Sequence, residues 1–201
     1  MTTFSLEQIK IVIERANIFL NSCKQSNGYS LTPNAEVTPF SNCFAIFLNY
    51  LINKNSSKKI NFNAYGEILV SDLYEYKKNR EKIVQLNNDK NFLQLLAFTL
   101  SALHLINATE KYTLKDIVSE LIPEDIESFL YENKIYKGLA TTGNVAMCSA
   151  IILIYANKFL NINCDDKLEK WIKTHLKYSN KYGLWLSLIH ISEPTRPLYI
   201  S

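Results

Sequence analysis

The sequence predicts an all-α protein built from stacked helical hairpins. Three segments, residues 40–51, 92–106 and 145–160, are apolar almost throughout and contain no Gly or Pro. Runs of this length favour buried helices over strands. Amphipathic segments alternate with them along the chain. The 201 residues include only five Gly and five Pro, too few for a turn-dense all-β fold.

The three apolar segments align with one another. Each contains an alanine, an apolar residue, any residue and a leucine, at residues 45–48, 97–100 and 150–153. Regular spacing of this kind is typical of a repeated supersecondary unit. A helix that is apolar on every side is normally central. We therefore expect these three helices to form an inner layer.

The amphipathic segments are expected to form outer helices. In the first, five residues spaced by three and four should face inward: Leu6, Ile9, Ile13, Ala16 and Leu20. The others cover residues 64–86, 113–133 and 165–178. Pro123 interrupts the second of these and is expected in the first turn of a new helix. In the last, the predicted inward residues are Leu168, Trp171, Ile172 and Leu176.

This alternation resembles the (α/α) toroid fold of terpenoid cyclases, protein prenyltransferases, lanthipeptide cyclases and many glycoside hydrolases and polysaccharide lyases. The resemblance covers residues 5–185 at the level of pattern. It implies three hairpins and one extra outer helix. We therefore expect residues 1–185 to be one domain, an incomplete (α/α) toroid.

The last residues differ from the rest of the chain. Residues 186–196 read Leu-Ser-Leu-Ile-His-Ile-Ser-Glu-Pro-Thr-Arg, which resembles the translation of a transposase adapter used in sequencing libraries. We expect residues 186–201 to be a non-native tail and the chain to be an N-terminal fragment of low solubility. Functional residues are therefore sought in residues 1–185.

Composition excludes several classes of protein. The net charge of +3 gives no reason to expect a nucleic-acid partner. The apolar segments are shorter than the roughly 20 residues of a membrane span, and no secretory signal is visible, so a cytoplasmic protein is expected. The four cysteines lack metal-site spacing and should be buried thiols. His104 and His175 are expected to be core histidines, and we predict neither a metal nor a cofactor.

One end of the predicted assembly carries the candidate ligand site. In an alternating ring, every connection from an outer to an inner helix emerges at the same end, here residues 24–38, 86–91, 134–144 and 179–185. These connections hold four of the five glycines and several aromatic residues. Loops on a rigid scaffold concentrate binding residues. The candidate substrate-binding residues are Tyr29, Asn34, Tyr136, Asn144, Tyr182 and Trp185.

The same connections contain helix-capping signals. Thr38 before Pro39, Asp89 or Asn91, and Asn144 are predicted N-caps of the three inner helices. If these helix N-termini share a cavity, their free N–H groups would favour an anionic or hydroxyl-rich ligand.

Glu36 and Asp89 are the candidate catalytic residues. Each lies near the predicted start of an inner helix, and glycoside hydrolysis requires two carboxyl groups flanking one cavity. By analogy at the level of fold, the leading hypothesis is a carbohydrate-active enzyme, either a glycoside hydrolase or a polysaccharide lyase.

Two alternatives stay open. A non-enzymatic helical-repeat interaction protein predicts a polar concave surface. An isoprenoid cyclase or transferase predicts a cavity lined by Phe, Tyr and Ile. The sequence leaves the oligomeric state open.

Overall fold

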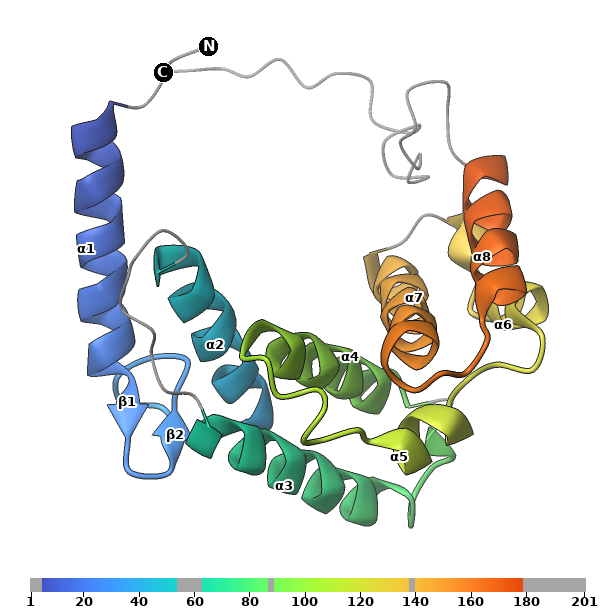
Figure 1. Cartoon of the computed structure of the whole chain (residues 1–201), viewed down its shortest axis with the longest axis horizontal. Helices are drawn as coiled ribbons and strands as arrows, with labels where there is room; N and C mark the ends of the chain where they lie inside the picture. Colours follow the sequence, from blue (N-terminus) through green and yellow to red (C-terminus); the bar gives the residue numbers. More distant parts are fainter. Residues whose placement is uncertain (1–4, 54–62, 87–88, 138–139, 179–201) are drawn as a thin grey trace. The chain divides into compact units, whose positions relative to one another are not determined.

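The computed structural model of the chain describes residues 5–53, 63–86, 89–137 and 140–178. Helices make up 72% of these residues, which confirms the mainly helical character (Figure 1). The chain divides into two compact units, Met1–Thr113 and Leu114–Ser201. Tyr182, Trp185 and the segment 186–201 lie outside the described residues.

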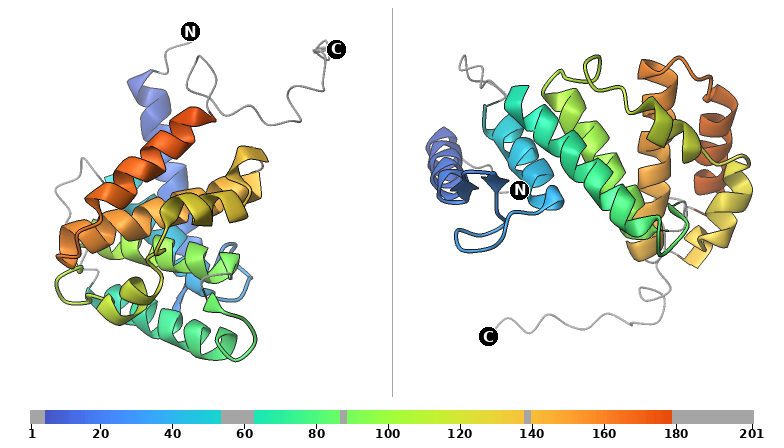
Figure 2. Two further views of the ribbon diagram at one scale, coloured as in Figure 1. Left: turned by 90° about the vertical axis from the view of Figure 1, so that its right-hand side faces the viewer. Right: turned by 90° about the horizontal axis from the view of Figure 1, so that it is seen from below.

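Four helices and a short hairpin form the described part of the first unit. They are α1 (Leu6–Ser22), β1 (Lys24–Gln25), β2 (Gly28–Tyr29), α2 (Pro39–Asn53), α3 (Asn63–Arg80) and α4 (Lys90–Leu105). Helix α2 packs against α4, α3 packs on both, and α1 packs on α2. Figures 1 and 2 show α3 lying alongside α2 and α4. Two of the three apolar segments, α2 and α4, thus lie side by side, and the amphipathic helix α3 packs against both.

The core of this unit is centred on α4. Phe92, Leu96 and Leu103 on this helix are fully buried, and burying each such side chain contributes about 1.5–3 kcal/mol. Helix α2 is less enclosed than predicted, since Phe44 and Leu51 are exposed. Helices α1, α3 and α4 cover only part of its circumference, so the expectation of a helix buried on all sides is wrong for α2.

The inward face predicted for α1 is mostly uncovered. Leu6 is 80% exposed and Ile9 and Ile13 are also exposed, whereas Leu20 is buried. Leu20 belongs to a core cluster with Cys23, Tyr29 and Ala45, which secures only the C-terminal end of α1. The spacing by three and four residues identified the apolar face of α1. It did not show how much of that face other described parts of the chain cover.

A β-hairpin occupies the start of the connection 24–38, for which no strand was predicted. The N–H of Tyr29 donates to Asn42 Oδ1 at 2.8 Å, and the Ser41 hydroxyl donates to the Tyr29 carbonyl at 2.5 Å. Gly28 has φ of +145°, and a Cβ there would lie 2.4 Å from Asn42 Oδ1. Only glycine fits this position, which fastens the hairpin to α2.

The second unit contains α5 (Lys115–Glu120), α6 (Ile126–Glu132), the 3₁₀ helix η2 (Ile135–Lys137), α7 (Ala140–Phe159) and α8 (Asp165–Lys177). Helix α7 packs with α5, η2 and α8, and α6 packs with α8. The break near Pro123 is confirmed, but α6 begins later, after the N-cap Asp125, whose carboxylate accepts the N–H of Glu127 at 3.1 Å.

The predicted start of α7 is wrong. The helix begins at Ala140, so Gly143 and Asn144 lie inside it and Asn144 is not its N-cap. One helical glycine costs only about 1 kcal/mol, which burial of Val145 and Ala146 offsets. Ile154 on α7 is 50% exposed, so this helix is not buried on all sides either.

Helix α8 ends one residue before the predicted bound, and only part of its predicted inward face is covered. Trp171 faces inward, as predicted, and packs on α7. Trp171 Nε1 donates to the carbonyl of Ala146 on α7 at 3.1 Å, and its ring stacks on the buried His175 with centroids 3.6 Å apart. Ile172 and Leu176 are exposed, contrary to prediction. Trp171 and His175 are one turn apart and lie on the same face of α8. That face is turned toward the rest of the unit, so Ile172 and Leu176 beside it stay exposed.

The four cysteines are free and buried, as predicted. Burial raises the pKa of Cys43 to about 12 and that of Cys148 to about 11. His175 is buried, whereas His104 is exposed, so the core assignment of His104 is wrong. Within the described ranges, no helix is long and apolar enough to cross a membrane.

Candidate functional site

Thr38 caps α2, as its position before Pro39 predicted. The N–H of Ser41 donates to Thr38 Oγ1 at 3.1 Å, and the N–H of Thr38 donates to Ser41 Oγ at 2.8 Å. These reciprocal bonds satisfy two backbone donors at the start of the helix. Because the Ser41 hydroxyl also donates to the Tyr29 carbonyl, the same two residues hold the start of α2 against the hairpin.

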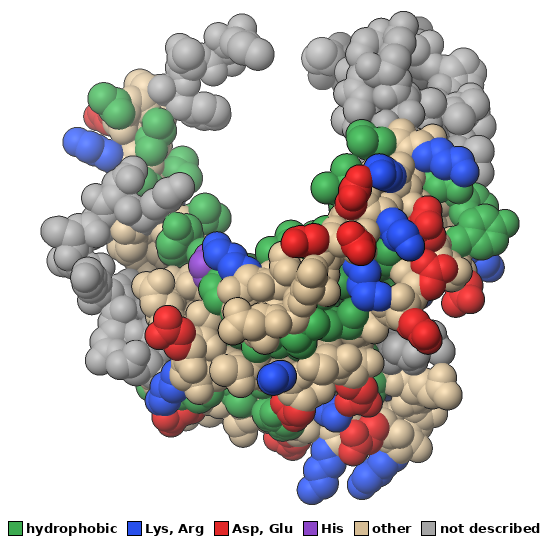
Figure 3. Space-filling model, turned by 45° about the vertical axis from the view of Figure 1, so that its right-hand side comes forward, with side chains coloured by type: hydrophobic (Ala, Val, Ile, Leu, Met, Phe, Trp, Pro, Cys, Tyr) green, Lys and Arg blue, Asp and Glu red, His purple; other side chains and the backbone are tan. Residues whose placement is uncertain are grey.

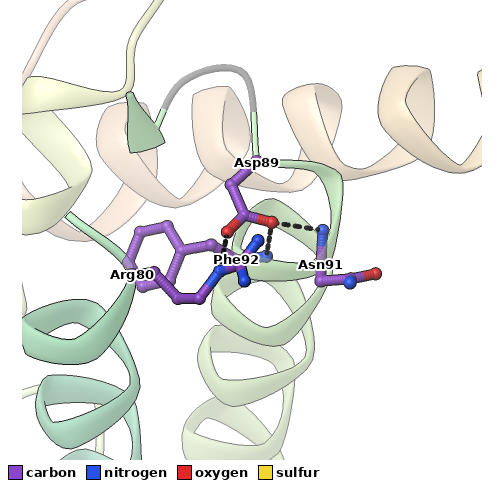
Figure 4. A network of polar contacts seen from close by, with 4 residues as sticks. All are labelled: Arg80, Asp89, Asn91 and Phe92. Carbon is purple, nitrogen blue, oxygen red and sulfur yellow. Dashed lines mark hydrogen bonds and ion pairs between the residues drawn. The ribbon is translucent and has the colours of Figure 1, made fainter. Parts of the chain in front are cut away.

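Asp89 is the N-cap of α4 (Figure 4). One carboxylate oxygen accepts the N–H groups of Asn91 and Phe92 at 3.0 and 3.2 Å. The other lies 2.6 Å from Arg80 Nε, and the Asp89 side chain is almost completely buried. This carboxylate therefore joins α3 to the start of α4, and its catalytic role stays a prediction.

The other candidates in the connection 24–38 differ in exposure. Asn34 and Glu36 are exposed. Tyr29 is buried in the core cluster, with its ring centroid 5.7 Å from that of Tyr65. Burial raises the pKa of the Tyr29 phenol. Tyr29 thus stabilises the hairpin, and it is not presented as an open stacking surface.

A cleft of about 430 Å³ opens where α2 begins and along α3. We call it the Asp72 cleft. Its lining residues are Asn27, Val37, Thr38, Pro39, Glu67, Ile68, Ser71 and Asp72. The described lining residues include Thr38, the predicted cap of α2, and Val37, the neighbour of Glu36. They do not include Glu36 or Asp89.

Two carboxyl groups on α3 meet opposite electrostatic conditions in this cleft. Partial burial raises the pKa of Asp72, and the charge of Glu75 adds to that rise, although Asn42 donates to Asp72 Oδ2 at 3.1 Å. The pKa of Glu67 is lowered, mainly by the hydrogen bond from Lys111, whose Nζ lies 3.1 Å from Oε1. The pKa values of the two carboxyls are thus shifted in opposite directions.

Sequence analysis missed both carboxyls because α3 was treated only as an outer helix. A signal was present at Asp72, which directly precedes the buried Leu73 and follows the buried Leu69 by three residues. A carboxylate beside such an apolar stripe is partly desolvated, and a desolvated carboxyl is a candidate functional group.

A second cleft, of about 460 Å³, lies between α6 and α8 in the second unit. We call it the tyrosine cleft. Its lining residues are Glu127, Ser128, Tyr131, Glu132, Lys173, Thr174, Lys177 and Tyr178. The predicted binding residue Tyr136 stacks on Tyr131 with centroids 5.2 Å apart, and its ring lies 6.3 Å from that of Tyr178. Asn144 is exposed on α7.

A phenylalanine cluster joins α2 and α4. Phe98 on α4 makes edge-to-face contacts with Phe40, Phe44 and Phe47 on α2, at centroid distances of 6.1, 5.4 and 5.9 Å. Phe44 is 43% exposed. Helix α2 contains no charged residue, so this cluster offers an apolar aromatic surface.

Comparison with known proteins returned no match: no family model fits the chain, and neither a curated protein nor a solved structure is similar to it.

Proposed function

We propose that this chain is a carbohydrate-active enzyme of the (α/α) toroid class, and that the Asp72 cleft hydrolyses glycosidic bonds. The packing of α1 to α4 as adjacent hairpins supports the class. The observation that carries the reaction is the half-buried Asp72 carboxyl, with its raised pKa, in a cleft that also contains Glu67. This pair takes the roles that sequence analysis gave to Glu36 and Asp89.

The chemistry needs one protonated and one ionised carboxyl. Asp72 gives its proton to the glycosidic oxygen as the bond from that oxygen to the anomeric carbon breaks. Glu67 accepts a proton from the water whose oxygen bonds to the anomeric carbon. The proton on Glu67 then returns to Asp72 through solvent, which restores both groups. Asn42 holds the Asp72 carboxyl in place during this cycle.

The charge of the cleft favours hydrolysis of a neutral sugar over elimination from a uronate. Among the described lining residues there is no lysine or arginine, whereas two are acidic. The cation beside Glu67, Lys111, is already paired with that carboxylate, so an anionic sugar would gain little attraction here. The neutral side chains Asn27, Thr38 and Ser71 are suited to hydrogen bonds with sugar hydroxyls.

Hydrolysis can be tested on a panel of neutral aryl glycosides and neutral polysaccharides with the full chain. We expect Asp72→Asn and Glu67→Gln each to lower kcat by about 100-fold. The matched control is Glu14→Gln on α1, a fully exposed site remote in sequence, which should leave kcat unchanged.

Two outcomes would count against this proposal. Loss of activity in Glu36→Gln and Asp89→Asn, with full activity in Asp72→Asn, would return the reaction to the originally predicted pair. Absence of hydrolysis across the whole panel would contradict a glycoside hydrolase.

The phenylalanine cluster favours a second candidate, an isoprenoid cyclase or transferase. The exposed ring of Phe44, on a helix that contains no charged residue, suits a hydrocarbon chain. Farnesol should displace a fluorescent apolar probe from the full chain, and Phe44→Ser should weaken this displacement about tenfold. Tyr50→Ser, a similarly exposed site on the same helix, is the control. Equal displacement in all three proteins would exclude this candidate.

A further inference from the structure

The tyrosine cleft combines exposed aromatic rings with hydrogen-bonding side chains. Tyr131 is 63% and Tyr136 is 40% exposed. They come from α6 and η2, and Tyr178 directly follows α8. Three separate segments therefore bring their tyrosines to one place, since Tyr136 contacts both of the others.

Tyr131 and Tyr136 are poorly covered by the described residues of the second unit, whereas Tyr178 is half-buried. Leaving large aromatic surfaces in water forgoes the free energy of burying them. The negative face of an aromatic ring attracts the C–H groups on one face of a pyranose ring. A saccharide would cover the tyrosine surface and still keep its hydroxyl groups hydrogen-bonded.

The polar lining is balanced in charge. Glu127 and Glu132 come from α6, and Lys173 and Lys177 from α8. Figure 3 shows acidic and basic side chains interspersed over the surface of the second unit that faces the viewer. Lys173 is already paired with Glu169 at 2.6 Å. A strongly charged ligand would gain little here, whereas these groups and the Thr174 hydroxyl can bind sugar hydroxyls. The Ser128 hydroxyl donates to Asp125 Oδ2 at 2.6 Å and can still accept from a sugar hydroxyl.

We infer that the tyrosine cleft is a binding site for a neutral oligosaccharide, with Tyr131 as the principal stacking residue. Its volume of about 460 Å³ is typical of ligand sites. The site lies wholly within the second unit and is separate from the Asp72 cleft. It binds sugar without cleaving it, so the inference does not depend on hydrolysis at Asp72.

Isothermal titration of the full chain with maltohexaose, cellohexaose, xylohexaose and mannohexaose tests this inference. We expect at least one of them to bind, with affinity about tenfold weaker in Tyr131→Ala. Tyr131→Phe should stay within about threefold of the unchanged chain, because stacking needs the ring and not the hydroxyl. Tyr50→Ala, an exposed tyrosine of the first unit, is the matched control.

The inference is wrong if none of the four sugars binds, or if Tyr131→Ala binds as tightly as the control. Asp72→Asn separates the two sites, since it should abolish hydrolysis and leave binding at the tyrosine cleft unchanged. If Asp72→Asn removes binding as well, the sugar is held at the Asp72 cleft and not here.

Discussion

Asn42 and Asp72 are joined by a hydrogen bond of 3.1 Å from Nδ2 to Oδ2. The Oδ1 of the same buried amide accepts the Tyr29 N–H at 2.8 Å. One side chain on α2 therefore links the hairpin to the carboxyl group of the Asp72 cleft. A substitution that moves the hairpin should therefore change the environment of Asp72, and a substitution at Asp72 should affect the hairpin.

Two glycine substitutions should have opposite effects on stability. Gly28→Ala places a Cβ 2.4 Å from Asn42 Oδ1 at a positive φ, so it should destabilise the chain by about 2 kcal/mol or more. Gly143→Ala adds a Cβ in open space within α7 and should stabilise it by about 0.5–1 kcal/mol. Urea unfolding measures both, and a neutral Gly28→Ala would contradict the close approach of hairpin and helix.

The stability of the chain should depend on pH through Asp72. Its pKa in the folded chain is raised above the ordinary 3.8, so folding favours the protonated carboxyl. The stability it contributes is complete below that ordinary value and is lost as the pH rises through the raised pKa. Asp72→Asn removes this loss. The free energy of unfolding of Asp72→Asn relative to the unchanged chain should therefore increase as the pH rises from about 4, and a constant difference would contradict this.

Asp89 should matter for stability, whatever its role in catalysis. Asp89→Ala removes the N-cap of α4 and the partner of Arg80, and should cost about 1–2 kcal/mol. Asp89→Asn keeps a capping oxygen and loses only the charge, so its cost should be smaller. Chemical denaturation separates them, with the exposed Glu36→Gln as control. Equal losses in the two Asp89 variants would show that the cap contributes little.

The four thiols should be unreactive in the folded chain. Each is buried, and burial raises the pKa of Cys43 to about 12. Since the thiolate is the reactive form, Ellman's reagent at about pH 8 should label the native chain slowly and all four thiols quickly in guanidinium chloride. Rapid labelling of one thiol before unfolding would identify a site that opens locally.

The sequence correctly predicted several features that depend on residues close together in the chain. The caps at Thr38 and Asp89 and, to within one residue, the bounds of α8 follow from local hydrogen bonding and helical periodicity, and the structure confirms them. The start of α7 was predicted wrongly because Gly143 reads as a boundary. A single glycine does not end a helix when the residues that follow it, here Val145 and Ala146, are buried.

The candidate residues named from the sequence differ from the described residues that line the two clefts. Tyr136 was a candidate, but its neighbours Tyr131 on α6 and Tyr178 directly after α8 were not, because sequence analysis treated both segments only as outer elements. Asp72 escaped notice for the same reason. The burial of Asp72 depends on its contact with Asn42 on α2, thirty residues earlier in the chain. The local pattern of residues around Asp72 does not show that contact.

The amino-acid sequence by itself determined the helical class and the alternation of apolar and amphipathic segments, because both follow from the spacing of side chains along one helix. It also indicated the buried thiols, because the cysteines lack metal-site spacing. Only the tertiary structure decided which apolar faces are covered, which carboxyl is desolvated and which tyrosines meet. Those properties depend on contacts between segments far apart in the chain, and the free energy of each contact exists only once both segments are folded.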